Sequence, residues 1–205
     1  MKHTPTAVVF DVGNVLLRWD PRNLYRKIFE DEGRMEWFLA NVCTSEWNLE
    51  QDRGRSWEEA VALLLDRHPE HEIPIRAFHE RWHETVSGAI EENVAVLERM
   101  RAAGVPTYCI TNFSGPKFRE AQKRFPFLAS FDGAIVSGEE CLLKPDPAIY
   151  RLLLDRYRLD AEDCIFIDDS IANVEGARAV GMHAIHYREP MDLMAELERY
   201  GLASA

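Results

Sequence analysis

The sequence predicts an α/β protein with a doubly wound, Rossmann-like parallel sheet and an inserted α-helical domain. Short apolar runs recur near residues 7–10, 105–110, 134–136, 164–167 and 183–187. Such runs are typical of strands buried on both faces of a parallel sheet. Helical patterns separate most of them, as parallel strands with crossover connections require. The exception is the stretch after the first run, where helical patterns continue to about Gly88 without a convincing strand.

An acidic residue and a glycine follow the first apolar run. Asp11 comes directly after Val9-Phe10, and Gly13 follows two residues later. The carboxyl ends of strands form the edge at which open α/β sheets bind ligands. Asp11 alone could equally cap a helix. Gly13 would let the backbone turn sharply or approach a bound group.

The stretch 17–88 is predicted to form a helical domain inserted into a core made of residues 1–16 and 89–205. Its candidate helices begin at Asp20-Pro21, cover 35–42, follow the capping box Ser56–Glu59, and cover about 74–86. From Glu91 the alternation of helices and strands resumes, which returns the chain to the sheet.

Composition limits the classes of partner and the compartment. A net charge of −11 argues against a nucleic-acid or anionic-membrane partner, which would need a basic surface. The four cysteines form no CxxC pair, which favours reduced thiols over a disulfide framework or a zinc site. The chain has no transmembrane segment, and its first strand follows Met1 too closely for a signal peptide. We therefore expect a cytoplasmic protein.

Polar side chains follow four strand ends or loops of the predicted sheet. They are Asp11, Thr111-Asn112, Lys144 and Asp168-Asp169. Three carboxylates at one edge would repel one another unless a cation lay between them, and oxygen ligands suit Mg²⁺. A lysine and a hydroxyl beside that metal suit a phosphoryl group. Each residue also has a structural alternative: the aspartates as helix caps, Thr111 as a turn former, Lys144 as a solvated loop residue.

The order and the residues of four motifs resemble those of the haloacid-dehalogenase-like hydrolase superfamily. The motifs are Asp-x-Gly-Asn-Val, Ile-Thr-Asn, Lys-Pro-Asp-Pro-x-Ile-Tyr and Ile-Asp-Asp-x-x-x-Asn, from Asp11 to Asn173. The chain looks most like the subfamily with a small helical cap between the first two motifs. That group includes sugar-phosphate phosphatases of the glucose-1-phosphate type and the N-terminal phosphatase domain of epoxide hydrolases.

The resemblance implies a Mg²⁺-dependent phosphatase that hydrolyses a small phosphorylated metabolite, possibly a sugar phosphate, as a monomer or homodimer. Asp11 would be the nucleophile that forms an aspartyl-phosphate. Thr111, Asn112 and Lys144 would hold the phosphoryl group. The magnesium ligands would come from Asp11, the Gly13 carbonyl, Asp168 and Asp169, with Asp169 favoured as the direct acidic ligand. Asn14 and Asn173 would support the site.

One position departs from the family's phosphatases, which usually carry a second aspartate, the general acid and base, two residues after the nucleophile. Gly13 stands there and can transfer no proton, a loss of about 10²- to 10⁴-fold in rate. The enzyme would then be slow or selective for good leaving groups, or a cap residue or Asn14 with a water would substitute. Asn14 could instead be only a turn residue.

The departure keeps two further hypotheses open. A 2-haloacid dehalogenase would use the same aspartate to attack carbon and needs no metal. A non-catalytic binding protein on the same scaffold is the third possibility. Gly13 is compatible with both, whereas the acidic pair Asp168-Asp169 favours phosphate chemistry.

The inserted domain is expected to set specificity because it alone can cover the site. Most of its tryptophans should pack the helical bundle, with Trp19 and Trp47 the better candidates for a substrate wall; the five are Trp19, Trp37, Trp47, Trp57 and Trp82. His79 and His83 have metal-ligand spacing but no third ligand. Gly88 could be a hinge or a plain turn glycine.

Overall fold

The computed structural model describes residues 4–202, so the first three residues, part of the signal-peptide expectation, lie outside it. Five parallel strands form the central sheet in the order β5-β4-β1-β6-β7. Their bounds are β1 Ala7–Phe10, β4 Thr107–Thr111, β5 Gly133–Val136, β6 Cys164–Asp168 and β7 His183–His186. The predicted doubly wound parallel sheet is confirmed.

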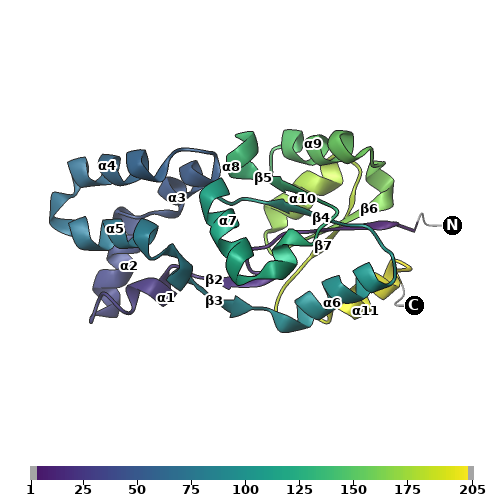
Figure 1. Ribbon diagram of the computed structural model, residues 1–205, viewed down its shortest axis with the longest axis horizontal. Coiled ribbons are helices and arrows are strands. Elements are labelled where there is room, and N and C mark those ends of the chain that lie inside the picture. Colours follow the sequence, from purple (N-terminus) through teal and green to yellow (C-terminus); the bar gives the residue numbers. More distant parts are fainter. Residues whose placement is uncertain (1–3, 203–205) are drawn as a thin grey trace.

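Helices cover both faces of this sheet (Figure 1). On one face lie α6 (Glu91–Ala102) and α11 (Leu193–Arg199), and on the other lie α9 (Pro147–Tyr157) and α10 (Ile171–Ala179). Val8 and Phe10 of β1 belong to the core under α6 and α11, while Ala7 and Val9 belong to the core under α9 and α10. Burial on both faces explains why β1 is a continuous apolar run.

Two further helices follow the strands on the other side of β1. Helix α7 covers Gly115–Arg124 after β4, and α8 covers Ser137–Glu140 after β5. Single 3₁₀ turns, η3 at Pro126–Ala129 and η4 at Ala161–Asp163, complete the connections. Among the described residues, no helix is both long enough and apolar enough to cross a membrane.

The chain leaves and re-enters the core through a second, two-stranded sheet that the sequence did not predict. Strand β2 (Leu17–Trp19) pairs antiparallel with β3 (Val86–Ala89). The expectation that no strand occurs in this region is therefore wrong. Both strands are too short to show an alternating pattern, and β3 contains a glycine, which is rare in strands. Gly88 pairs with Arg18 in this ribbon, and its hinge role stays a prediction.

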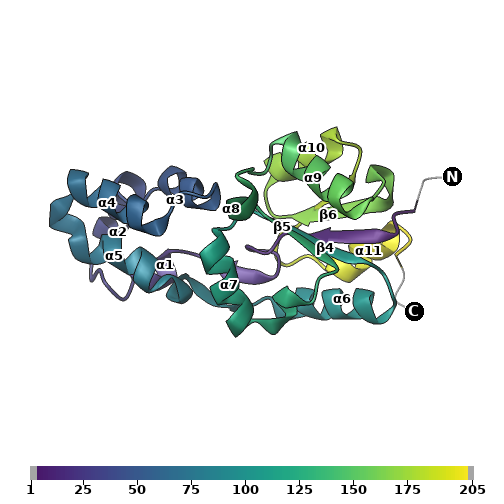
Figure 2. The same cartoon turned by 45° about the horizontal axis from the view of Figure 1, so that its top comes forward.

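Between these two strands lie five helices, at the end of the molecule away from the sheet (Figure 2). They are α1 Arg22–Tyr25, α2 Glu32–Asn41, α3 Ser45–Asp52, α4 Trp57–Arg67 and α5 Glu72–Glu80, with 3₁₀ turns η1 Pro69–His71 and η2 Trp82–Thr85. We call residues 17–88 the cap; its predicted boundaries as a separate domain stay a prediction.

Two elements of the cap differ from the sequence expectation. Helix α3 was not predicted, although the Thr44 hydroxyl accepts a hydrogen bond from the Trp47 backbone N–H and caps it. The helix expected over 74–86 ends at Glu80 and gives way to the 3₁₀ turn η2. The capping box at Ser56 behaves as predicted, since its side chain accepts from the Glu59 N–H.

Aromatic packing holds the cap together and joins it to the core. Tyr25, Phe38 and Phe78 are fully or almost fully buried and contact one another through Tyr25. Trp57 stacks on Phe78, and its indole N–H donates to the Ser114 hydroxyl of the core at 2.8 Å. The apolar centre of the cap is continuous with core residues such as Phe113 and Phe118, and a buried hydrogen bond joins the two parts as well.

Candidate active site

The predicted acidic residues meet at the carboxyl edge of the sheet. Asp11 follows β1, and Asp168 ends the neighbouring strand β6, with Asp169 next in the chain. One carboxylate oxygen from each of the three lies within 4.8 Å of the others. Thr111 is buried at the end of β4, the strand on the other side of β1. These residues come together because parallel strands end at the same edge.

Lys144 lies at the centre of this cluster. Its side chain is completely buried, and Nζ lies 2.8 Å from Asp11 Oδ1 and 2.6 Å from Asp168 Oδ2. Nζ also donates to the Ile110 carbonyl at 3.1 Å. Burial lowers the pKa of Lys144, but the two carboxylates outweigh it and hold this pKa above its usual value. The alternative of a solvated loop lysine is therefore wrong.

Asn112 fixes the loop that carries Lys144. Its Oδ1 accepts from the Lys144 backbone N–H at 2.8 Å, and its Nδ2 donates to the Lys144 carbonyl at 3.1 Å. The peptide bond from Lys144 to Pro145 is cis. Because both ends of its amide bind this backbone, the Asn112 side chain positions the lysine loop.

Asp168 is held by its neighbours more tightly than Asp169. Asn173 Nδ2 lies 3.0 Å from both Asp168 oxygens, and the Ser170 N–H donates to Oδ1 at 2.8 Å. Asp169 is exposed as a residue, and burial of its carboxyl followed by the charge of Asp168 raises its pKa. Asp169 thus has the more accessible oxygens, and Asn173 orients Asp168.

One of the two carboxylate oxygens of Asp11 is held by its neighbours. Oδ1 accepts from the Val12 N–H at 2.7 Å and contacts Lys144. Burial raises the pKa of Asp11, against the opposing charge of Lys144. A carboxylate whose Oδ1 is held in this way can direct Oδ2 toward an electrophile.

The donor set fits a divalent cation. Three carboxylates face one ammonium group, so the fully ionised cluster carries two uncompensated negative charges. All of its side-chain donors are oxygens, which suit Mg²⁺ better than zinc or copper. Asp11, Asp169 and the Gly13 carbonyl would be the direct ligands, with Asp168 beside them.

The turn after Asp11 explains the role of Asn14. It also has room for a side chain at position 13, so steric crowding is not the reason for a glycine there. Asn14 has φ of 54°, its N–H donates to the Leu17 carbonyl, and its Oδ1 accepts from the Trp19 N–H at 3.1 Å. These contacts match the turn role. A Cβ built on Gly13 would meet no atom within 4 Å. The space beside Gly13 is therefore open.

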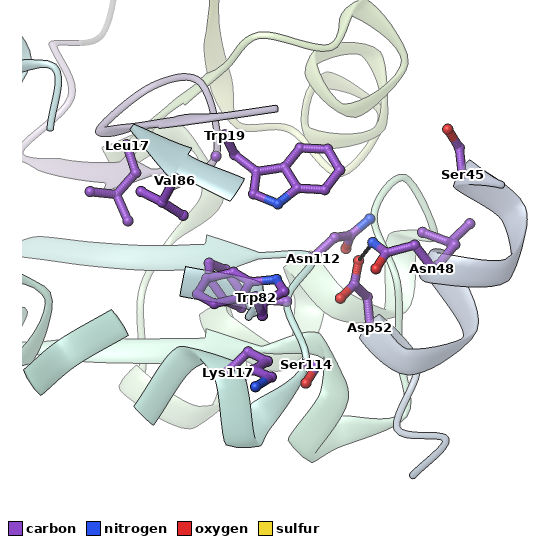
Figure 3. Close-up of a pocket in the computed structure, with 13 residues that line it drawn as sticks. Leu17, Trp19, Ser45, Asn48, Asp52, Trp82, Val86, Asn112, Ser114 and Lys117 are labelled. Atoms are coloured by element: carbon purple, nitrogen blue, oxygen red, sulfur yellow. Dashed lines mark hydrogen bonds between the residues drawn. The ribbon is translucent and has the colours of Figure 1, made fainter. Parts of the chain in front are cut away.

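A cavity of about 240 Å³ lies against this open space (Figure 3). Its walls are mostly aromatic and aliphatic, with a few polar groups on the side of α3 and the loop after β4. The lining residues used below are Gly13, Trp19, Asp52, Trp82, Asn112 and Lys117. The cavity joins the motif residues to the cap.

The cap tryptophans divide into wall and core. Trp19 lines the cavity as expected, and Trp82 lines it although it was not singled out. Trp47 is buried in the cap, where its indole N–H donates to the Ala60 carbonyl at 3.2 Å, so its expected place in the wall is wrong. Trp57 is buried, and Trp37 is half exposed beside His71.

Sequence reasoning missed one acidic residue of the cavity. Asp52, at the end of α3, accepts a hydrogen bond from Asn48 Nδ2 at 3.2 Å. Burial raises the pKa of its carboxyl to about 7, and hydrogen bonding to the Ser114 backbone opposes this rise. The sequence signal was slight: the spacing of Asn48 and Asp52 by four residues on a helix that had not been recognised.

Comparison with known proteins identifies the family. The profile of the haloacid dehalogenase-like hydrolases matches residues 5–181. The chain therefore belongs to this family of hydrolases, and the resemblance drawn from its four motifs is confirmed.

Individual relatives span most of the chain. A sesquiterpene phosphatase, astK, from Aspergillus oryzae is 26% identical over 94% of this chain and 95% of its own length. A phosphorylated carbohydrates phosphatase from Thermotoga maritima is 25% identical over 88% of this chain and 83% of its own length. Other relatives are longer; the chain spans 33% of the pig bifunctional epoxide hydrolase 2.

A solved structure shows the same fold. A HAD family enzyme from Bacteroides thetaiotaomicron, in complex with magnesium and inorganic phosphate, superimposes with a TM-score of 0.73 at 18% identity. The match covers 94% of this chain and 98% of that one. The fold over almost the whole chain is thus that of a solved HAD family enzyme.

Proposed function

We propose that this chain is a Mg²⁺-dependent phosphomonoesterase that works through an aspartyl-phosphate on Asp11. The observation that supports this most is Lys144, buried between Asp11 and Asp168 beside a third carboxylate. A site that holds the Lys144 ammonium and offers carboxylate ligands to a divalent metal ion suits the charges of a phosphoryl group. Similarity to two proteins named as phosphatases supports the same chemistry.

The residues act in two steps. Asp11 Oδ2 attacks phosphorus in line, and the bond from phosphorus to the leaving oxygen breaks. Water then attacks the aspartyl-phosphate, which releases inorganic phosphate and restores the carboxylate. Lys144 offsets charge on the nucleophile and on the phosphoryl oxygens, and the Thr111 hydroxyl and Asn112 N–H hold those oxygens. Bound Mg²⁺ would supply Lewis-acid polarisation of the phosphoryl group.

The substrate we propose is a small phosphorylated metabolite whose organic group occupies the cavity. Trp19 and Trp82 supply apolar surface, and Asn48 and Asp52 supply hydrogen bonds. Both a sugar ring, which has apolar faces, and a compact terpenyl group fit this description. The two phosphatase relatives, one named for sesquiterpenes and one for phosphorylated carbohydrates, represent these two classes of leaving group.

The experiment is release of inorganic phosphate from sugar phosphates and terpenyl phosphates, with Mg²⁺ and with EDTA. Asp11→Asn is the inactive variant, and Asp155→Asn, an exposed aspartate on α9, is the matched control. We expect Mg²⁺-dependent release that Asp11→Asn abolishes and Asp155→Asn preserves. Chloride release from a 2-haloacid without metal would instead establish the dehalogenase, and metal binding without turnover the binding protein.

A further inference from the structure

We propose that Asp52 of the cap protonates the leaving group and then activates the hydrolytic water, in place of the side chain that Gly13 lacks. This proposal rests on the proposed phosphatase function. The need is chemical: an alkoxide is a poor leaving group unless it gains a proton, and water attacks phosphorus faster when a base removes one. Among the motif residues, Asp11 is the nucleophile and Lys144 is fixed by two carboxylates.

The cavity itself selects Asp52. Its lining contains two titratable side chains, Asp52 and Lys117. The Lys117 ammonium is engaged by the His79 carbonyl at 2.8 Å and by Glu120 at 2.9 Å. Asp52 and Gly13 line the same cavity, and the space over Gly13 is empty to 4 Å around a built Cβ. A leaving group above Gly13 therefore enters the cavity that Asp52 lines.

Asp52 is held where the cap abuts the core. Its carbonyl accepts from the Ser137 hydroxyl of α8 at 2.5 Å. A Cβ on Gly54, two residues later, would lie 3.2 Å from the Gly138 carbonyl, so the backbones pack closely here. Figure 3 shows Asn48 and Asp52 pointing from α3 toward Asn112. The carboxyl is thus positioned against the loop that binds the phosphoryl group.

The environment suits both roles of such a group. Burial raises the pKa of Asp52 to about 7, so its acid and its carboxylate are both populated near neutral pH. Most charged side chains of the neighbouring helices α7 and α8 have other partners: Lys117 with Glu120, Arg119 with Glu139, and Glu140 with Arg156 of α9. Arg124 donates to the His83 and Val86 carbonyls, and Lys123 is exposed. On α3 and just after it, Glu50 pairs with Arg53, and Arg55 donates to Gln51; Glu58 and Glu59 of α4 are exposed.

The proton balance closes over one turnover. As the bond from phosphorus to the leaving oxygen breaks, the protonated Asp52 carboxyl gives its proton to that oxygen, and the alcohol departs. The Asp52 carboxylate then takes a proton from water while the water oxygen bonds to phosphorus and the bond to Asp11 breaks. Inorganic phosphate, the Asp11 carboxylate and the Asp52 acid are the products.

The test compares an alkyl phosphate, which needs the proton, with p-nitrophenyl phosphate, whose leaving group needs it little. Asp52→Asn keeps the shape of the side chain and one of its two acceptor oxygens. We expect it to lower kcat on the alkyl ester by about 10²- to 10⁴-fold and on the aryl ester by less than about 10-fold. Glu50→Gln, a half-exposed neighbour on α3, is the matched control and should leave both rates unchanged.

Two further readouts separate proton transfer from binding. In wild type, kcat/KM for the alkyl ester should fall above about pH 7, because the acid form is lost, and Asp52→Asn should remove this limb. Adding Gly13→Asp to Asp52→Asn should restore alkyl-ester turnover at least 10-fold, because the built Cβ meets no atom within 4 Å. A wild-type profile without the limb overturns the proposal without any variant.

The outcomes distinguish this proposal from the function on which it rests. Equal losses on both esters, with a raised KM and no rescue by Gly13→Asp, would make Asp52 a binding residue and leave the phosphatase intact. Wild type that releases no phosphate from either ester or from the metabolite panel would overturn the phosphatase and this proposal together.

Discussion

Lys144 is the residue whose contacts define the site most closely. Removing its ammonium would leave Asp11 and Asp168 buried against each other without a counter-charge. Removing one partner of a buried ion pair typically lowers the free energy of unfolding by about 3–5 kcal/mol. In urea titrations with EDTA we expect Lys144→Met to lose this much unfolding free energy. In assays with Mg²⁺ we expect the same variant to lose phosphate release.

The control for this variant is Lys123→Met, an exposed lysine on α7. It should change the urea midpoint little. Lys144→Met with unaltered stability would show that the ammonium does not balance the two carboxylates, and the charge argument for the site would fail.

Asp52 gives a second prediction at this scale, on stability. Because burial raises its pKa to about 7, the folded state is penalised when the carboxyl is ionised. The stability of the folded state is therefore unaffected by Asp52 ionisation below the pKa of the unfolded chain, and it falls as the pH rises from there through about 7. Asp52→Asn should therefore raise Tm by about 2–6 °C at pH 8, and by less at pH 5.5. Lower Tm at pH 8 would contradict the raised pKa.

Single residues were predicted from sequence where they belong to an ordered motif. Asp11, Lys144, Asp168 and Asp169 were placed together because each follows a strand or loop at one sheet edge. Asp52 was not predicted, because its place in the cavity depends on how α3 packs against α8, which no local pattern encodes. The same is true of Trp82, whose helical spacing resembles that of any core residue.

At the scale of elements, the link between cap and core depends on a few buried contacts. The Trp57 indole N–H donates to the Ser114 hydroxyl at 2.8 Å, and both residues are buried. Ser114→Ala would leave that N–H unsatisfied, at a cost of about 1–3 kcal/mol. We expect Tm to fall by roughly 2–6 °C and KM to rise as the cap loosens.

Ser87→Ala, an exposed serine in β3, is the control for Ser114→Ala in thermal melts and kinetics. If both variants melt and turn over like wild type, the indole contact does not hold the cap in place.

Elements were predicted well where burial on both faces produces a long apolar run, as in β1 and β6. The short strands β2 and β3 were not predicted because three or four residues are too few to show an alternating pattern. Their pairing also joins residues 70 apart, which depends on the tertiary fold. Helix α3 escaped because its mean character is polar: of its eight residues, Trp47 and Gln51 are the buried ones.

At the scale of the whole molecule, the fold brings the buried Lys144 ammonium, three carboxylates and a cavity with aromatic walls to one place. Four motifs spread from Asp11 to Asn173 converge at the sheet edge, and the cap encloses the side on which a leaving group would lie. Monomer or homodimer, and a cytoplasmic location, stay predictions of the sequence.

The measurement that tests this account most directly is phosphate release by wild type and Asp11→Asn, with Mg²⁺ and after its removal by EDTA. We expect wild type with Mg²⁺ to release phosphate from at least one small phosphomonoester, at least 10³-fold less after EDTA, and Asp11→Asn to release none above background. Release that persists in Asp11→Asn, or that EDTA does not reduce, would contradict it.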